Sequence, residues 1–349
     1  MKQRIVFIKK KQDSFVLKKK AEKQKKNISR TEKGISVTIA FGGDIMLSRG
    51  VGSRNKEEGY DRIFKHFYPN KNIADDAVLF YNLESPFTKL QDNDIDQESF
   101  IFKANPKNIE ILKKLKGNRK MVLSLANNHI RNGGGEGVDA TMELLQEEEI
   151  FPVGVQKGEK TSIQTVMQSG KKLCFGAYSY DGGVTNMTDS EGNIQKYFVN
   201  PIQKNEIFAD IQKMEQEQCD LKIISFHWGA EYRFEPTFQQ QKFAHELIDA
   251  GVDIIAGGHS HILGKAEKYK GKMIYYSLGN FIFDQDWGKH QQGGSFDTIY
   301  DEKLEKDTVP TYIGNTFVHE YFFPDNGGLK LKNVKNIKHR INYGALEEY

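Results

Sequence analysis

The stretch VDIIAGGHSH, residues 252–261, places two histidines immediately after an apolar run that is typical of a buried strand. Gly257 and Gly258 separate the run from the histidines, and glycine lets the backbone turn sharply at a strand end. His259 and His261 are therefore expected to leave the strand tip together. With one residue between them, the two imidazoles could reach one or two metal ions.

The same arrangement, an apolar run that ends in residue types able to bind metal, occurs four more times. The runs are ISVTIAFGGD (35–44), AVLFYNLE (77–84), MVLSLANNH (121–129) and LKIISFHWG (221–229), and their ends carry Asp44, Asn82, Glu84, Asn127, Asn128, His129 and His227. In open α/β sheets, ligands bind outside the carboxyl ends of the strands, where distant side chains converge. We therefore predict a metal site built from strand tips. Oxygen and imidazole donors without thiolate suit manganese, iron or zinc.

Amphipathic stretches with recognisable helix ends lie between these runs. Asn105 is expected to cap a helix that begins at Pro106, and another helix is expected from Gly137. A third follows Pro201, and the segment 236–251 begins with proline and ends with glycine, a common pair of helix boundaries. The apolar runs lack alternation, as in strands covered on both faces. This order of elements predicts an α/β core.

The composition of the sequence changes after the last apolar run of the core. Residues 284–307 are polar and predict a long loop over or beside the site. The turn sequence PDNGG (324–328) lies between residues 311–323 and 329–341, which predicts a C-terminal antiparallel hairpin. We expect residues 35–340 to form a single domain, with the hairpin packed on its sheet.

The chain has 349 residues and a formal net charge of +3, and 38% of its residues are hydrophobic, which is enough for a substantial core. Residues 1–33 hold 13 Lys and Arg against 3 Asp and Glu, so the rest of the chain is mildly acidic. We expect residues 1–34 to be a basic, disordered leader. The alternative is a segment that lies against anionic lipid or nucleic acid. We find no signal peptide or transmembrane segment in the sequence.

Two cysteines are present, Cys174 in an apolar run and Cys219 after a helical stretch. Neither has the paired spacing of a zinc ribbon. We expect two buried or partly buried thiols with no shared role.

Seven motifs together resemble the CapA capsule-biosynthesis family, which is associated with poly-γ-glutamate and belongs to the calcineurin-like metallophosphoesterase superfamily. The motifs are GGDIML (42–47), NLESP (82–86), FKANP (102–106), LANNHIRNGG (125–134), FHWGAEY (226–232), GGHSH (257–261) and SLGNFIFDQ (277–285). Their combined order is far more specific than any one of them. The resemblance implies a four-layer α-β-β-α sandwich of two mixed sheets, with one or two divalent metal ions at the sheet edge.

The resemblance also implies roles for individual residues. The implied metal ligands are Asp44, Glu84 as the bridging carboxylate, Asn128, His227, His259 and His261. His129 would lie beside the substrate as general acid or leaving-group stabiliser. Two cations a few Å apart can share a hydroxide nucleophile and neutralise charge on a phosphoryl oxygen.

Three residues depart from the broad phosphoesterase pattern. Met46 stands where many of these enzymes have a histidine, and a thioether is a poor ligand for a hard metal. Glu84 replaces the usual aspartate and adds a methylene. Ile130 follows His129 where an orienting carboxylate is common, so this imidazole needs another partner.

Four further residues are weaker candidates. Glu231, four residues after His227, could orient a ligand or act as a base, or it could be a solvated loop carboxylate. Arg49 and Lys103 could bind an anionic substrate, or each could form an ordinary ion pair. Asn280 lies at another strand tip and could line the crevice. The remaining histidines lack ligand companions.

Two functions remain open. The first is a metal-dependent hydrolase that acts on a phosphoester or a related bond, with a γ-glutamyl amide as a less conventional target. The second is a non-catalytic accessory subunit that binds an anionic polymer during its synthesis or export. The resemblance implies a membrane-bound polymer synthase complex as partner and a membrane-associated or extracytoplasmic location, and we expect no specific nucleic-acid partner.

Overall fold

The computed structural model describes residues 33–52, 59–64, 73–89, 100–158, 162–283, 313–342 and 345–348. The chain divides into two compact units. The smaller contains Met1–Ser36 with Phe322–Lys330, and the larger contains Val37–Tyr321 with Leu331–Tyr349. In the smaller unit the backbone N–H of Asp325 donates to the carbonyl of Lys33 over 2.9 Å. Nearly all of the predicted leader and the whole predicted loop at 284–307 lie outside the described residues.

The first sheet has the strand order β17-β16-β15-β1-β2-β3-β4, and β14 pairs with β1. Its strands are β1 (Gly34–Ile45), β2 (Val78–Leu83), β3 (Lys120–Ser124), β4 (Ile150–Val153), β14 (Asn280–Ile282), β15 (Ile313–Pro324), β16 (Lys330–Asn342) and β17 (Ala345–Glu348). Strands β1 to β4 run parallel, whereas β16 and β17 are antiparallel. The sheet is therefore mixed, and its parallel part contains three of the predicted apolar runs.

The second sheet has the order β12-β13-β11-β10-β7-β6. Its strands are β6 (Ile163–Gln168), β7 (Lys171–Ser179), β10 (Leu221–His227), β11 (Ile254–Gly258), β12 (Ala266–Tyr269) and β13 (Lys272–Tyr275). The four central strands are parallel, and β6 and β12 are antiparallel edges. The stretch that begins at Val252 thus lies in the middle of a sheet, as its continuous apolar character indicated.

A third, smaller sheet was not predicted from the sequence. It has the order β5-β9-β8, with β5 (Val155–Lys157), β8 (Gly183–Thr188) and β9 (Ile194–Val199). Residues alternate between half-buried and exposed along β8, because only one face of this hairpin is covered.

Four α-helices lie entirely within the described residues: α4 (Ile109–Lys116), α5 (Gly134–Glu147), α6 (Lys204–Gln216) and α7 (Phe238–Asp249). Residues 49–52 are also helical. Three short 3-10 helices are η1 (Tyr60–Phe64), η2 (Pro106–Asn108) and η3 (Ile130–Gly133). The side chain of Asn105 caps the turn that begins at Pro106, as predicted. Helix α7 starts two residues later than predicted, because Thr237 and Gln240 form a capping box. No helix among the described residues is long and apolar enough to cross a bilayer.

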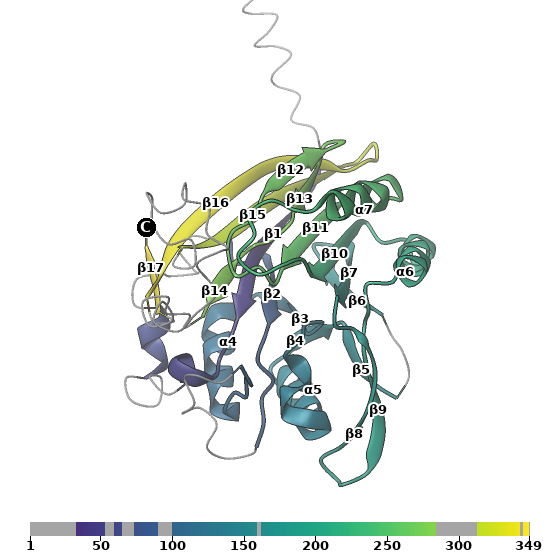
Figure 1. The fold of residues 1–349 in the computed structure, drawn as a ribbon. Helices are drawn as coiled ribbons and strands as arrows, with labels where there is room; N and C mark the ends of the chain where they lie inside the picture. Colours follow the sequence, from purple (N-terminus) through teal and green to yellow (C-terminus); the bar gives the residue numbers. More distant parts are fainter. Residues whose placement is uncertain are drawn as a thin grey trace, which may run out of the picture. The chain divides into compact units, whose positions relative to one another are not determined.

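The larger unit has the expected order of layers, helices, sheet, sheet, helices (Figure 1). The two sheets contact each other through Phe80 of β2 and Phe175 of β7, whose rings stack with centroids 5.7 Å apart. Helices α6 and α7 cover the second sheet through a core that includes Ile211 and Leu247. Helices α4 and α5 lie beside the parallel strands of the first sheet. The predicted mixed α/β sandwich is confirmed.

The two cysteines form a disulfide bond, so the expectation of two separate thiols was wrong. Cys174 lies in β7, and Cys219 lies between α6 and β10, the strand that pairs with β7. Their Cα atoms are 5.9 Å apart, within the range that a disulfide requires. This proximity comes from strand pairing across 45 residues of sequence, and no local spacing reveals it.

Candidate metal centre

The carboxyl ends of strands from both main sheets meet at one place. Asp44, at the end of β1, lies in register with Asn82 of β2 and Asn280 of β14. The amide nitrogen of Asn82 donates to Oδ1 of Asp44 over 2.9 Å and lies 3.5 Å from Nδ1 of His227, at the end of β10 in the other sheet. The prediction that strand tips converge therefore holds for both sheets.

Glu84 lies at the centre of this cluster and is completely buried. Its Oε1 is 3.7 Å from Nε2 of His227, 3.8 Å from Nε2 of His129 and 3.9 Å from Nε2 of His261. Neither oxygen of the carboxyl group has a hydrogen-bond partner among the described residues. Three imidazoles thus surround a carboxylate without bonding to it directly.

Three donors, from His227, His259 and Asn128, form one group at the centre. Nε2 of His227 lies 3.1 Å from Nδ1 of His259 and 2.8 Å from Oδ1 of Asn128. We call His227, His259 and Asn128 the His227 side of the centre.

Two donors, from Asp44 and His261, form a second group at the centre. Nδ1 of His261 is 3.9 Å from Oδ2 of Asp44 and 3.0 Å from Oδ1 of Asn280, so Asn280 fixes the orientation of this imidazole. One ligand atom each from Asp44, Glu84 and His261 lie within 4.8 Å of one another. We call Asp44 and His261 the Asp44 side.

The backbone around the two predicted histidines is strained. His259 has φ 89° and His261 has φ 59°, in the left-handed region that favours glycine. A Cβ on Gly258 would lie 2.9 Å from Oδ1 of Asp44, so glycine is required for this close approach. Such strain is common where the surrounding structure holds a functional group in place.

Burial keeps the imidazoles uncharged. It lowers the pKa of His129 and of His259 to about 4 and that of His261 to about 3, and it lowers the pKa of His227 well below the usual value. Neutral imidazoles have the free lone pair that a metal ligand needs.

The pKa values of the two carboxyl groups, Asp44 and Glu84, shift in the opposite direction. Burial raises the pKa of Asp44 to about 7, although the hydrogen bond from Asn82 opposes the shift. Burial, and then the neighbouring Asp44, raise the pKa of Glu84 well above its usual value. Without an added cation, these groups therefore tend to hold protons.

These residues fit a divalent metal ion. A buried carboxylate without hydrogen-bond partners is costly by about 1–3 kcal/mol or more, and a cation among these donors would compensate it. The donors are oxygen and imidazole nitrogen, the set that suits manganese, iron or zinc.

The partner that His129 needs is Asn132, which sequence reasoning missed. Oδ1 of Asn132 lies 3.0 Å from Nδ1 of His129, and the ring of Phe102 stacks on the imidazole with centroids 4.0 Å apart. The side chain of Asn127 supports the same segment by accepting from the backbone N–H of His129 over 3.0 Å.

The sulfur of Met46 is engaged in hydrogen bonds. The sulfur accepts hydrogen bonds from the backbone N–H of Ser48 over 3.2 Å and from its hydroxyl over 3.1 Å. Both side chains are completely buried.

The other candidates from the sequence are Arg49, Glu231 and Lys103. The buried guanidinium of Arg49 lies 4.6 Å from the ring centre of Phe102, and its charge lowers the pKa of Glu84. Glu231 is exposed, although partial burial of its carboxyl group raises its pKa, and its charge raises the pKa of Glu84. Lys103 is half-buried.

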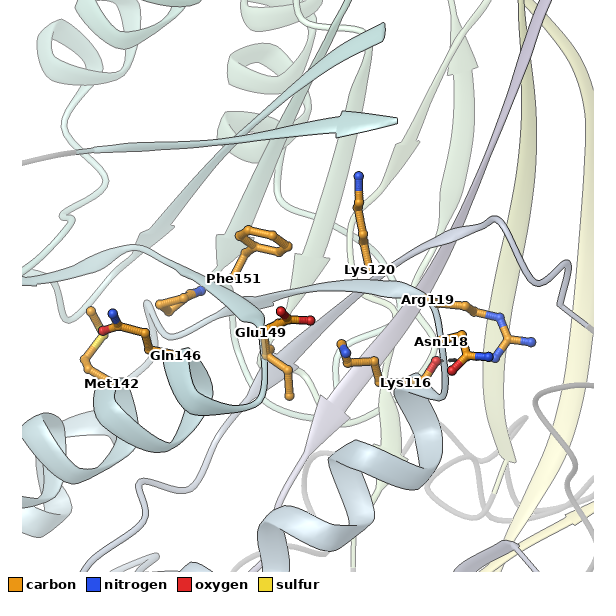
Figure 2. A pocket seen from close by; sticks show the side chains of 10 residues that line it. Lys116, Asn118, Arg119, Lys120, Met142, Gln146, Glu149 and Phe151 are labelled. Carbon is orange, nitrogen blue, oxygen red and sulfur yellow. Dashed lines mark hydrogen bonds between the residues drawn. The ribbon is translucent and has the colours of Figure 1, made fainter. Parts of the chain in front are cut away.

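A cavity of about 660 Å³ lies at the other ends of β3 and β4, away from this centre. Figure 2 shows that its cationic side chains diverge, with Lys120 and Arg119 pointing to different sides. The amine of Lys120 bonds to the carbonyl of Met167, and Arg119 bonds to Asp75 over 3.2 Å. The polar groups of this cavity do not converge, unlike those around Glu84.

Comparison with known proteins identifies the family. The family described as bacterial capsule synthesis protein PGA_cap matches residues 38–285. The PGA biosynthesis protein CapA of Bacillus subtilis (strain 168) is 30% identical over 264 residues, which cover 72% of this chain and 64% of that protein. The capsule biosynthesis protein CapA of Bacillus anthracis is 30% identical over 258 residues, which cover 72% and 61%. The chain thus spans less than two thirds of the length of these relatives.

Among solved structures, a novel phosphatase from Mycoplasma pneumoniae is similar, with a TM-score of 0.47 and 15% sequence identity. The similarity covers 90% of this chain and 95% of that protein. The family match includes every residue of the candidate centre, from Asp44 to Asn280. The chain therefore belongs to the bacterial capsule synthesis protein family PGA_cap.

Proposed function

We propose that this protein is a metal-dependent hydrolase in capsule biosynthesis, associated with poly-γ-glutamate, and that it cleaves a phosphoester or a related bond. The observation that carries the proposal is the buried carboxylate of Glu84, which has no hydrogen-bond partner among the described residues and lies 3.7–3.9 Å from three imidazole nitrogens. Such a costly arrangement persists where it serves a function.

In this proposal the ligands of one or two divalent ions, manganese, iron or zinc, are Glu84 and the residues of the His227 side and the Asp44 side. When bound, the metal supplies a hydroxide nucleophile at neutral pH and neutralises charge on the substrate oxygen. The protein holds these ligands rigidly, because Asn82 and Asn280 fix Asp44 and His261 through hydrogen bonds of 2.9 Å and 3.0 Å.

The remaining side chains would act on the substrate. His129, neutral and held by Asn132, is positioned to exchange a proton at Nε2 with the reacting group. The cation of Arg49 would attract an anionic substrate toward Glu84. We assign weaker roles to Lys103 as a substrate contact and to Glu231 as a second base.

The test is hydrolysis of an aryl phosphodiester by the purified full chain with manganese. We expect His129→Ala to lose about 10²-fold or more of this activity while it keeps its metal. The matched control is His245→Ala, because His245 is also half-buried and lies beside a carboxylate, that of Glu267, but is outside the centre. Equal activity in His129→Ala and the wild type would overturn the catalytic assignment.

A non-catalytic accessory role is the second candidate, and Met46 favours it. The sulfur of Met46 accepts hydrogen bonds from Ser48, so Met46 offers no free ligand atom to the centre. A residue with a free donor at this position would give the centre one more ligand. Metal ions and Arg49 would then hold the carboxylates of an anionic polymer. A protein that is inert on phosphate esters but retains poly-γ-glutamate only with metal present would favour this role.

The disulfide bears on location and partners. Disulfides form and persist in oxidising compartments, so the Cys174–Cys219 bond supports an extracytoplasmic or membrane-associated site of action. The partner that this proposal implies is a membrane-bound polymer synthase complex.

A further inference from the structure

Tyr180 places an exposed aromatic ring at the edge of the centre. The residue directly follows β7, and its backbone N–H donates to the carbonyl of His227 over 3.0 Å. The centre of its ring lies 4.7 Å from that of the His259 imidazole and 6.4 Å from that of the His227 imidazole. The residue is nevertheless 52% exposed. Part of the ring therefore packs on two of the proposed metal ligands, while the rest is open to a bound molecule.

The turn that carries Tyr180 is fixed by Arg131. The guanidinium of Arg131 donates to the carbonyl of Asp181 over 2.7 Å, to the carboxylate of Asp181 over 3.1 Å and to the carbonyl of Gly183 over 3.2 Å. Arg131 itself lies two residues after His129, so these bonds join the turn to the segment that holds the proposed acid. A ring held in this way loses little freedom when a ligand binds to it.

Three negative charges act on the hydroxyl of Tyr180. Burial, and then the charges of Asp181, Glu231 and Glu84, raise the pKa of this hydroxyl, so it keeps its proton at neutral pH. A bound metal ion would neutralise Glu84, and Arg131 pairs with Asp181 over 3.1 Å. The exposed carboxylate of Glu231 would still repel an anion. An uncharged group is therefore favoured beside this ring.

We propose that Tyr180 determines substrate specificity by packing its ring against an uncharged ring of the substrate. This inference rests on the proposed function and names its substrate class, a phosphoester whose organic part contains a sugar or an aromatic ring. Both kinds of ring have a face with little charge, which packs on the apolar face of tyrosine. A linear chain of carboxylates has no such face. Tyr180 therefore selects for the organic part of the substrate, and the metal ligands act on the phosphoryl group.

The experiment measures by calorimetry how the full chain, loaded with Mn²⁺, binds three non-hydrolysable anions. They are methylphosphonate, phenylphosphonate and the phosphonate analogue of glucose 1-phosphate, of which only the last two carry a ring. We expect a ring to strengthen binding by about 3- to 10-fold over methylphosphonate. Tyr180→Ala should lose this preference and keep its affinity for methylphosphonate, whereas Tyr180→Phe should keep both. The ring-bearing anion that Tyr180→Ala weakens more identifies the substrate's ring as a sugar or as an aromatic group.

The matched control is Phe238→Ala, because Phe238 is an aromatic residue that is 74% exposed and begins α7, in another segment of the chain. This variant should keep the wild-type preference. The manganese content of each variant separates a substrate contact from mere support of the metal ligands.

Three results would overturn the inference and leave the proposed hydrolysis standing. They are a wild type that binds neither ring-bearing anion more tightly than methylphosphonate, an unchanged preference in Tyr180→Ala, and a loss of manganese from that variant. A protein that shows the preference but does not hydrolyse the aryl phosphodiester would instead overturn the proposed function.

Discussion

Oδ1 of Asn132 lies 3.0 Å from Nδ1 of His129 and 2.8 Å from the backbone nitrogen of Phe102. A backbone N–H can only donate, so the atom that faces it is the amide oxygen, and this oxygen must also accept from the imidazole. Neutral His129 therefore carries its proton on Nδ1. Its Nε2 has a lone pair, which lies 3.2 Å from the amide nitrogen of Asn128.

The first prediction concerns this pair. Asn132→Ala should lower the rate of phosphodiester hydrolysis by about 10- to 100-fold without changing the metal content, because His129 loses its orientation and its preferred tautomer. Asn132→Asp should restore most of the activity, since a carboxylate also accepts from Nδ1. Nitrogen-15 NMR of the imidazole reports the tautomer independently of activity. A tautomer in Asn132→Ala identical to that of the wild type would contradict the positioning role.

The second prediction concerns Glu84. Glu84→Gln should leave the metal-free protein as stable as the wild type or more stable, because glutamine is a neutral replacement for a carboxyl group whose pKa burial raises. The variant should lose the stabilisation by manganese, which for the wild type is about 2.7 kcal/mol when free metal is 100 times the dissociation constant.

Thermal unfolding with and without Mn²⁺ measures both effects. Glu231→Gln removes a more exposed carboxylate and serves as control, because its response to metal should persist. A Glu84→Gln protein that manganese stabilises as strongly as the wild type would rule out Glu84 as a ligand.

The third prediction is the pH dependence of metal binding. Below pH 7 the metal-free protein keeps a proton on Asp44, whose pKa is about 7, whereas His259 and His261, with pKa values of about 4 and 3, are already neutral. Metal must displace the carboxyl proton, so affinity should fall as the pH drops through 7, by about tenfold per pH unit for each proton displaced.

Calorimetry in two buffers with different heats of ionisation counts the released protons. We expect release at about pH 6 and little at about pH 8.5. An affinity that stays constant over this range, and declines only near the pKa of the imidazoles, would show that Asp44 is not involved.

The fourth prediction concerns the disulfide. Replacing both Cys174 and Cys219 by serine should lower the free energy of unfolding by about 4 kcal/mol, the loop-closure value for a bond that spans 45 residues. Urea denaturation measures the change. A reducing agent should destabilise the wild type by a similar amount and leave the double variant unaffected. Equal stability of the two proteins would contradict a bond that contributes to folding.

The strands that position the centre could be predicted from sequence because of how they are buried. Strands β10 and β11 are covered on both faces, so their sequences are mostly apolar without strict alternation, and Gly257 and Gly258 mark where β11 ends. The hairpin of β8 and β9 was missed because only one of its faces is covered. The disulfide was missed because it depends on the pairing of β7 with β10.

The centre itself was partly predictable for a similar reason. Aspartate, glutamate and histidine are often found at strand ends, but their recurrence at the ends of several apolar runs indicated a site. Asparagine is common in turns, so Asn132 carried no signal of its own. Asn82 was recognised only as a strand-end residue, and the distances reveal that these two residues orient His129 and Asp44. A conventional carboxylate after His129 would have revealed its partner, but Ile130 occupies that position.

The hydrogen bond from His259 to Asp44 connects positions 215 residues apart. A cation held between such distant segments would cross-link most of the chain. Its ligand set would be complete only after both sheets had formed and packed together. Loading with metal would then report the last stage of maturation, and an incompletely folded chain would have no centre to fill.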